Sequence, residues 1–199
     1  MRTLAYFFLR AKHWQIFLFL VVLIVVAQVL SLLLDFGAHR SGPFPGLTAL
    51  VYLIVLVLLL LFLFCFLGWF ASVGFFLASI TQPALNLKTG LFRFALLYPA
   101  VYLPLVTLAL RILPTDGVVF MVIFLPHLLA MLCMFYNVYF VAKALVLAES
   151  AKRASFSDYA LLFFLLWFFP IGIWMVQPRV NRLYTEGTRI VPSVRASTT

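Results

Sequence analysis

The chain has 199 residues, of which 66% are apolar and only 10% carry a charge, and its mean hydropathy is +1.19. Soluble domains have about 25% charged residues, so this composition excludes a soluble globular protein. The net charge of +9 does not indicate nucleic-acid binding, because the Lys and Arg residues flank apolar runs and form no basic motif. We therefore expect an all-α, multi-pass membrane protein whose basic residues meet anionic lipid headgroups.

The N-terminal residues predict a short interfacial helix followed by a first span. Aromatic and basic residues are interleaved over residues 1–10, which is typical of a helix that lies in the membrane interface. The apolar run that follows predicts a span over residues 14–34. This run is longer than the apolar core of a signal peptide and no small-residue cleavage motif follows it, so we expect it to be retained.

The second apolar run, residues 47–81, is too long for one crossing. As a single helix its 35 residues would reach about 52 Å at about 1.5 Å per residue, whereas the hydrocarbon core is about 30 Å thick. We predict that residues 47–68 cross the membrane. The remainder either continues into the headgroups or bends at Gly68 or Gly74.

Two further spans are expected over residues 92–112 and 118–142. The third span contains Pro99 and Pro104, and each proline removes one backbone hydrogen bond. A kinked helix that packs against its neighbours is the prediction. The fourth span carries more polar side chains than any other.

The last apolar run, residues 159–176, is interrupted by Pro170 and Gly172. Such a break lets a segment enter the membrane and turn back, and a kinked fifth crossing is the alternative. We predict a bundle of four transmembrane helices plus a C-terminal broken or re-entrant element, with five transmembrane helices as the alternative. Residues 1–184 then form a single transmembrane domain, and residues 185–199 form a disordered polar tail.

The distribution of basic residues favours the re-entrant interpretation. With a cytoplasmic N-terminus and four crossings, only Arg40 and Arg111 lie on the outer side. If the last run turns back, the four arginines after it join the cytoplasmic side, as the positive-inside rule requires. Both termini are then cytoplasmic. The inner basic residues are Arg2, Arg10, Lys12, Lys88, Arg93, Lys143, Lys152, Arg153, Arg179, Arg182, Arg189 and Arg195.

Five sequence blocks together resemble one family. Through these blocks the chain resembles an uncharacterised family of small multi-pass bacterial membrane proteins. The resemblance covers nearly the whole length of the chain. It implies a bacterial inner-membrane location and brings no activity, substrate or catalytic residue. The blocks are R-A-K-H-W-Q-I-F (10–17), W-F-A-S-V-G (69–74), F-Y-N-V-Y-F-V-A-K-A-L (135–145), F-S-D-Y (156–159) and W-F-F-P-I-G-I-W-M-V-Q-P-R-V-N (167–181).

Polar residues inside the spans form one candidate site. His127 lies well inside the fourth span, and such residues are functional candidates by default. The alternative is a neutral histidine that bonds a neighbouring helix or a carbonyl freed by a proline. The side chains that could supply hydrogen bonds in this site are Tyr98, Tyr102, Tyr136 and Asn137. Asn137 lies about 15 Å from His127 along the helix and cannot touch it directly.

A second candidate group follows the broken element, at the membrane boundary. It consists of Gln177, Arg179, Asn181 and Arg182. These residues are candidates for contact with a lipid phosphate or with a partner's carboxylate, since Arg binds both through paired hydrogen bonds. Simple anchorage by snorkelling side chains is the alternative.

The inventory of chemical groups does not indicate an enzyme. All five carboxylates lie in loops, at span boundaries or in the tail, and the sequence has no motif for a catalytic metal, a phosphate loop or an activated nucleophile. Cys65 and Cys133 lie within apolar runs, which is typical of buried thiols rather than of disulfides or metal ligands. We expect no cofactor and no metal.

The leading functional hypothesis is a non-enzymatic subunit or scaffold of an inner-membrane assembly. Its partners are then bilayer lipids and other membrane proteins. The alternative is a small transporter or channel with a site at the proline-broken helices near His127. A lipid-modifying membrane enzyme is the second alternative.

Overall fold

The computed structural model describes residues 2–41, 45–81, 87–112, 117–150 and 152–196. The regular structure over these residues is entirely α-helical, which confirms the predicted fold class. The helices are α1 (Arg2–Arg10), α2 (His13–Ser41), α3 (Pro45–Ile80), α4 (Thr89–Ile112), α5 (Gly117–Ser150), α6 (Phe156–Trp167) and α7 (Phe169–Ala196).

Four helices, α2 to α5, are long and apolar enough to cross a membrane. Their number agrees with the sequence prediction, but α2, α3 and α5 all extend further than expected. The helix α3 passes Gly68 and Gly74 without interruption, and α5 continues to Ser150. With 36 and 34 residues, they are about 54 and 51 Å long. Each is therefore about 20 Å longer than the hydrocarbon core.

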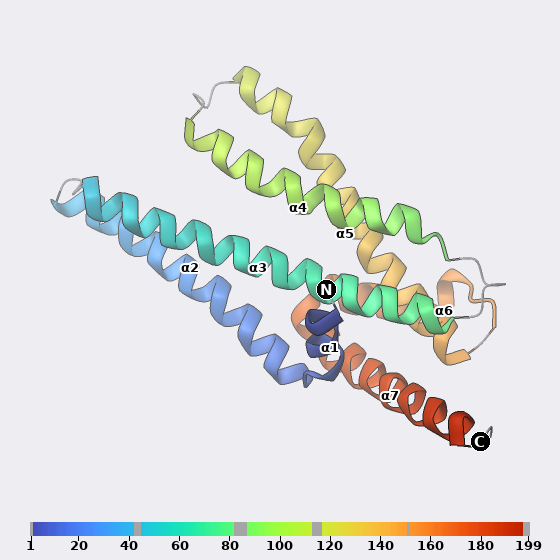
Figure 1. Cartoon of the computed structure of the whole chain (residues 1–199). Helices are drawn as coiled ribbons and strands as arrows, with labels where there is room; N and C mark the ends of the chain where they lie inside the picture. Colours follow the sequence, from blue (N-terminus) through green and yellow to red (C-terminus); the bar gives the residue numbers. More distant parts are fainter. Residues whose placement is uncertain (1, 42–44, 82–86, 113–116, 151, 197–199) are drawn as a thin grey trace.

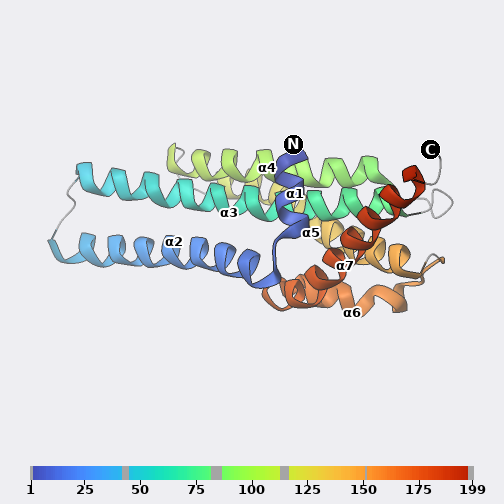
Figure 2. The ribbon, with the colours of Figure 1, turned by 60° about the horizontal axis from the view of Figure 1, so that its bottom comes forward.

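The spans form two antiparallel hairpins, α2 with α3 and α4 with α5. Figure 1 shows these hairpins diverging toward the C-terminal ends of α2 and α4, which we name the open end. At the opposite end, α1, α6 and α7 gather around the C-terminal halves of α3 and α5, as Figures 1 and 2 both show. We name this the packed end. Its buried side chains come from residues 8–20, 67–77, 92–96, 138–145 and 159–180.

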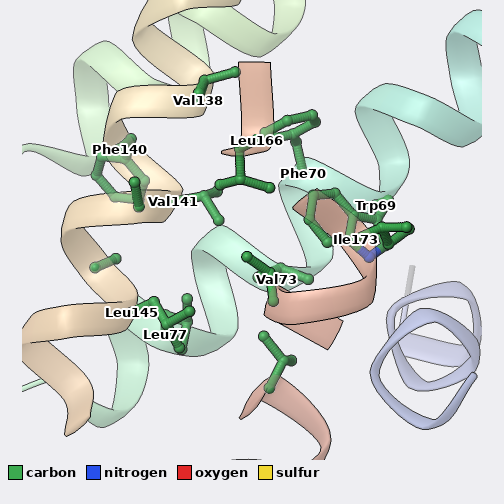
Figure 3. Close-up of a cluster of buried hydrophobic side chains, with 14 of the residues drawn as sticks. Trp69, Phe70, Val73, Leu77, Val138, Phe140, Val141, Leu145, Leu166 and Ile173 are labelled. Carbon is green, nitrogen blue, oxygen red and sulfur yellow. The ribbon is translucent and has the colours of Figure 1, made fainter. Parts of the chain in front are cut away.

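The packed end holds a dense core (Figure 3). On α3, the side chains of Trp69, Phe70, Val73 and Leu77 are all 0% exposed, and their spacing places them along one side of the helix. Figure 3 also shows core side chains from three further helices, namely Phe140, Val141 and Leu145 of α5, Leu166 of α6 and Ile173 of α7.

Gly74 lets α4 pack closely on α3. A Cβ atom at this position would lie 2.6 Å from Cε1 of Phe92, so a larger residue would displace that ring. Phe92 in turn stacks on Phe140, with ring centroids 4.0 Å apart and planes at 11°. Small residues at helix contacts are usual in membrane proteins, where van der Waals fit replaces the hydrophobic effect as the source of association.

The helices α6 and α7 meet at a sharp turn at Phe168. The N–H of Phe168 donates to the carbonyl of Phe164 at 3.2 Å and closes the end of α6. Pro170 is the second residue of α7. The first-turn N–H groups of a helix have no partner within the helix, so the missing N–H of Pro170 removes no hydrogen bond there. The proline therefore begins a new helix and does not kink an old one.

Gly172 permits the close return of α7 along α6. A Cβ atom here would contact the carbonyl oxygen of Leu165 and would lie 2.8 Å from Cα of Leu166. Both figures show α7 running back from the turn. With its 12 residues, α6 is only about 18 Å long, too short to cross a bilayer core. The predicted re-entrant element is therefore a two-helix hairpin.

The remaining differences from the sequence prediction concern boundaries. The broken element begins at Phe156, three residues before the expected position 159. The helix α7 continues to Ala196, through most of the segment 185–199 in which we expected disorder, and residues 197–199 lie outside the described residues. The expected interfacial helix over residues 1–10 corresponds to α1.

Candidate functional site

Gln177 is fully buried at the packed end, where it joins three helices. The indole N–H of Trp69 on α3 donates to Gln177 Oε1 at 2.8 Å. The Nε2 atom of Gln177 donates to the carbonyls of Phe8 and Ala11 at the end of α1, at 2.8 and 3.0 Å. The last carbonyls of a helix have no partner within it. A side chain of α7 therefore supplies the donors that the end of α1 lacks.

Asn181, one turn further along α7, extends this contact. Its Nδ2 donates to the Ala11 carbonyl at 3.2 Å, and its Oδ1 accepts from Gln177 at 2.9 Å. Both amides were candidates for contact with a lipid headgroup or with a partner protein. The structure instead places Gln177 in the core and Asn181 half-buried beside it, and α1 engages their polar atoms.

The start of α2 meets the same region. The backbone N–H of Lys12 donates to Gln15 Oε1 at 2.8 Å, which satisfies one of the unpaired donors at the helix N-terminus. His13 and Phe17 pack on Trp174 of α7, with ring centroids 4.5 and 5.9 Å away. The last helix, α7, is therefore joined to the end of α1 by amide hydrogen bonds and to the start of α2 by aromatic contacts.

Asn137 donates a hydrogen bond to an unpaired backbone carbonyl of a neighbouring helix. Pro99 lacks the N–H that would otherwise bond the carbonyl of Ala95 in α4. The Nδ2 atom of Asn137, on α5, donates to this carbonyl at 2.9 Å. The Asn137 side chain is fully buried, and among the described residues its Oδ1 has no partner. The amide therefore joins α4 to α5 at the carbonyl that the proline leaves free.

Tyr98 and Tyr102 bind the turn of α5 that contains Pro126. The Tyr98 hydroxyl donates to the carbonyl of Pro126 and the Tyr102 hydroxyl to that of Ile123, both at 3.1 Å. These bonds hold α4 against α5 where the proline interrupts the helical hydrogen bonds. The His127 ring lies 6.0 Å from that of Tyr102, and the residue is exposed on the surface of the helices.

The structure therefore divides the expected polar site into two parts. Tyr98, Tyr102 and His127 lie together around the kink of α5. Asn137 lies in the core of the packed end, and the Tyr136 ring lies 5.8 Å from that of Tyr139. The ten residues that separate His127 from Asn137 along α5 keep them apart.

Arg179 and Arg182 share one carboxylate of the same chain. Arg179 Nη1 lies 3.7 Å from Glu149 Oε2, and Arg182 Nη2 lies 3.3 Å from Glu149 Oε1. The carboxylate of a partner was one expected target for these arginines. The structure shows that they bind a carboxylate of the same chain, Glu149 of α5. Because Glu149 closes α5, this contact places the basic part of α7 at the packed end.

A further polar cluster joins α5 to α6, and it was not among the sequence candidates. Lys143 Nζ donates to the Tyr139 hydroxyl at 3.1 Å. The Tyr139 ring packs edge-on against that of Tyr159, with ring centroids 5.6 Å apart. Burial, followed by the hydrogen bond and charge of Tyr139, raises the pKa of Tyr159 to about 12, so its hydroxyl stays protonated. The four-residue spacing of Tyr139 and Lys143 was the available signal.

A cavity of about 280 Å³ lies between α3 and α4 in the open half of the molecule. Thr107, one of its two polar lining residues, donates its hydroxyl to the Leu103 carbonyl of its own helix at 2.7 Å. No group of three His, Cys, Asp or Glu side chains suited to a metal occurs in the part of the chain that the structure describes. The cavity is lined by Tyr52, Leu53, Val55, Leu56, Leu59, Thr107 and Leu108.

All five sequence blocks that carry the family resemblance contribute to the packed end. Each block supplies at least one buried residue of the common core: Ala11, Trp69, Val138, Tyr159 and Ile173. The resemblance itself stays a prediction, since no protein-family model, no curated protein and no solved structure matches the chain.

Proposed function

We propose that the protein is a non-enzymatic subunit or scaffold of a bacterial inner-membrane assembly. The observation that carries this proposal is the contrast in burial between the two ends. The packed end is a complete core formed by the chain itself. The transmembrane segments, in contrast, bury less than a quarter of their most apolar stretches, with values between 11% and 22%.

The composition of the open end supports a protein partner. At the start of α5, Phe120, Met121 and Phe124 are 70%, 77% and 57% exposed. Phe and Met are enriched at protein interfaces, and Met adapts readily to the shape of a partner. The partner in this proposal is an apolar transmembrane segment of another polypeptide that packs against the open end.

The use of the intramembrane polar groups favours this function over the two alternatives. A transporter needs polar groups along a pathway, and an enzyme needs a nucleophile or an acid–base pair beside a pocket. Asn137, Tyr98 and Tyr102 are instead engaged by backbone carbonyls of neighbouring helices. Their arrangement supports a packing role.

Both termini lie on the cytoplasmic side in this proposal. The helix α1, the ends of α3 and α5 and the basic part of α7 meet at the packed end, together with Lys143 and the Lys152–Arg153 pair. The positive-inside rule assigns such an end to the cytoplasm. Reporter fusions after residue 199 test this orientation. A reporter that is active only in the cytoplasm should give the signal, and a signal from a reporter that is active only outside would contradict the orientation.

Purification of the full chain in mild detergent tests the assembly. We expect a complex larger than the monomer, with a second membrane polypeptide in fixed stoichiometry. The double variant Phe120→Ala/Met121→Ala should release the partner without lowering the unfolding temperature. The matched control Phe164→Ala/Met175→Ala, which changes exposed residues of α6 and α7, should retain it. A monomer that carries only lipid, or equal release by both double variants, would contradict the proposal.

A further inference from the structure

Lys143 differs from the other basic side chains of the described structure in its burial and pairing. Only two described Lys or Arg side chains are half-buried, Lys143 and Arg179, and Arg179 pairs with Glu149. The Lys143 ammonium has a tyrosine hydroxyl as its partner, and no carboxylate of the described residues lies within 4.0 Å of it. The exposed basic side chains are Arg10, Lys12, Lys88, Arg93, Lys152, Arg153 and Arg182.

The carboxylates near this end are engaged elsewhere. Glu149 is bound by the two arginines of α7 described above, and Glu186 lies 4.0 Å from Arg182. Asp158 closes the start of α6, where its Oδ2 accepts the N–H and the hydroxyl of Ser155 at 2.7 and 2.9 Å. The half-buried charge of Lys143 is therefore not neutralised by the described part of the chain.

The surroundings of Lys143 fit an anion that carries oxygen acceptors. An ammonium group has three N–H donors, and the Tyr139 hydroxyl accepts one of them. The edge-on packing of the Tyr139 ring against Tyr159 holds that hydroxyl in place. A partly buried cation is costly without a counterion. An incoming anion would accept the remaining donors and remove this cost.

The membrane supplies such an anion together with apolar chains. Lys143 lies at the predicted boundary of the fourth span, on α5, where lipid phosphates are concentrated. The adjoining helix α6 exposes an apolar surface made of Phe156, Leu161 and Phe164, which are 55%, 67% and 56% exposed. A phospholipid could place its phosphate at Lys143 and its acyl chain along α6.

We propose that Lys143, held by Tyr139, binds the phosphate group of an anionic phospholipid at the junction of α5 and α6. This site is independent of the open end and of the proposed assembly function. A free phosphate ion has the same oxygen acceptors but does not use the apolar surface of α6.

Native mass spectrometry of the full chain, released from detergent with dioleoyl phosphatidylglycerol, tests the site. Lys143→Gln should weaken lipid binding roughly tenfold, because it removes a charge-assisted hydrogen bond. Lys143→Arg should retain most of the binding. Tyr139→Phe should weaken it about two- to threefold, because the ammonium loses its fixed partner. The matched control Lys152→Gln removes the same charge from an exposed lysine and should leave binding unchanged.

Equal loss in Lys143→Gln and Lys152→Gln would overturn the proposal, since it would show attraction to net charge alone. Unchanged binding in Lys143→Gln would also overturn it. Displacement of the lipid by millimolar inorganic phosphate would assign the site to a free ion and reject the lipid. If Lys143→Gln does not fold, Tyr139→Phe decides the question, and unchanged lipid binding in the folded Tyr139→Phe protein would overturn the assignment.

Discussion

The packed end and the open end both contain parts of α3 and α5, yet similar apolar residues of these helices are buried at one end and exposed at the other. On α3, Trp69 and Phe70 are 0% exposed, whereas Leu53 and Val57 are 56% and 53% exposed. On α5, Val141 is fully buried and Met121 is 77% exposed. Hydropathy does not separate the two ends, because both are strongly apolar.

The two ends differ in how closely the surfaces of their helices fit together. The packed end combines a glycine that admits a ring, stacked aromatic pairs, and amides that reach unpaired carbonyls. Apolar side chains gain little by leaving an apolar solvent, so helices in a membrane associate where their surfaces fit. The comparison indicates that this chain concentrates its specific contacts at one end.

The largest effect is expected from Gly172→Ala at the packed end. The new methyl group would contact the backbone of Leu165 and Leu166, which cannot move without opening the α6–α7 hairpin. We expect a loss of more than about 3 kcal/mol of unfolding free energy, measured by thermal unfolding in detergent. Gly90→Ala is the matched control, since a Cβ there has no neighbour within 4 Å. Similar unfolding temperatures in the two variants would show that the hairpin is not closely packed.

One substitution made at both ends tests the comparison directly. Leu145 is 0% exposed and Leu32 is 65% exposed. Leu145→Ala should cost about 3 kcal/mol, because it leaves a cavity in the core. Leu32→Ala should stay within about 0.5 kcal/mol. Equal losses in the same unfolding assay would mean that the open end is also specifically packed.

Replacing a buried glutamine and replacing an exposed one should change the unfolding free energy by different amounts. Gln177→Leu leaves the Trp69 indole and the Phe8 and Ala11 carbonyls without their partner, and it should cost about 2 kcal/mol. Gln28 is exposed on α2, so Gln28→Leu should be neutral or slightly stabilising in lipid. Protease cleavage between α1 and α2 should also rise in Gln177→Leu alone. An unchanged cleavage rate would contradict the role of Gln177 in holding α1.

The smallest effect is a coupling between Asn137 and Pro99. Asn137→Leu removes the donor that bonds the Ala95 carbonyl. Pro99→Ala supplies a backbone N–H for the same carbonyl, so the two changes together should cost about 1 kcal/mol less than the sum of the single variants. Exact additivity in this double-mutant cycle would show that Asn137 does not compensate for the proline.

The sequence predicted the number of spans and favoured a reversal in the last apolar run over a fifth crossing, and the structure places the turn at Phe168, two residues before Pro170. Run length and charge are local properties, and they decide both features. The continuous course of α3 was harder to predict, because a glycine within an apolar run indicates a bend as readily as a contact. Gly74 accommodates Phe92, which lies on the next helix, and no local pattern identifies that pair.

The positions of the buried polar residues were also hard to predict from local sequence patterns. Gln177 follows an apolar run and precedes an arginine, a pattern that is typical of the headgroup region. It is buried because α1 folds over it, and this contact depends on residues at the other end of the chain. Asn137 was grouped with His127 in one candidate site although ten residues separate them, and its actual partner, the Ala95 carbonyl, is decided by how α4 and α5 align. Both placements depend on tertiary contacts that periodicity does not report.

The bond between Gln177 and α1 has a consequence for synthesis on the ribosome. The Phe8 carbonyl is made 169 residues before the amide that binds it. At about 5–20 residues per second, the interval is roughly 8 to 35 seconds. During this time the end of α1 must be solvated by the membrane interface, and the Trp69 indole, made 108 residues before Gln177, must be solvated for the later part of it. The packed end can therefore close only after translation has reached α7, so an interrupted chain keeps its N-terminal helix undocked and accessible to quality-control proteases.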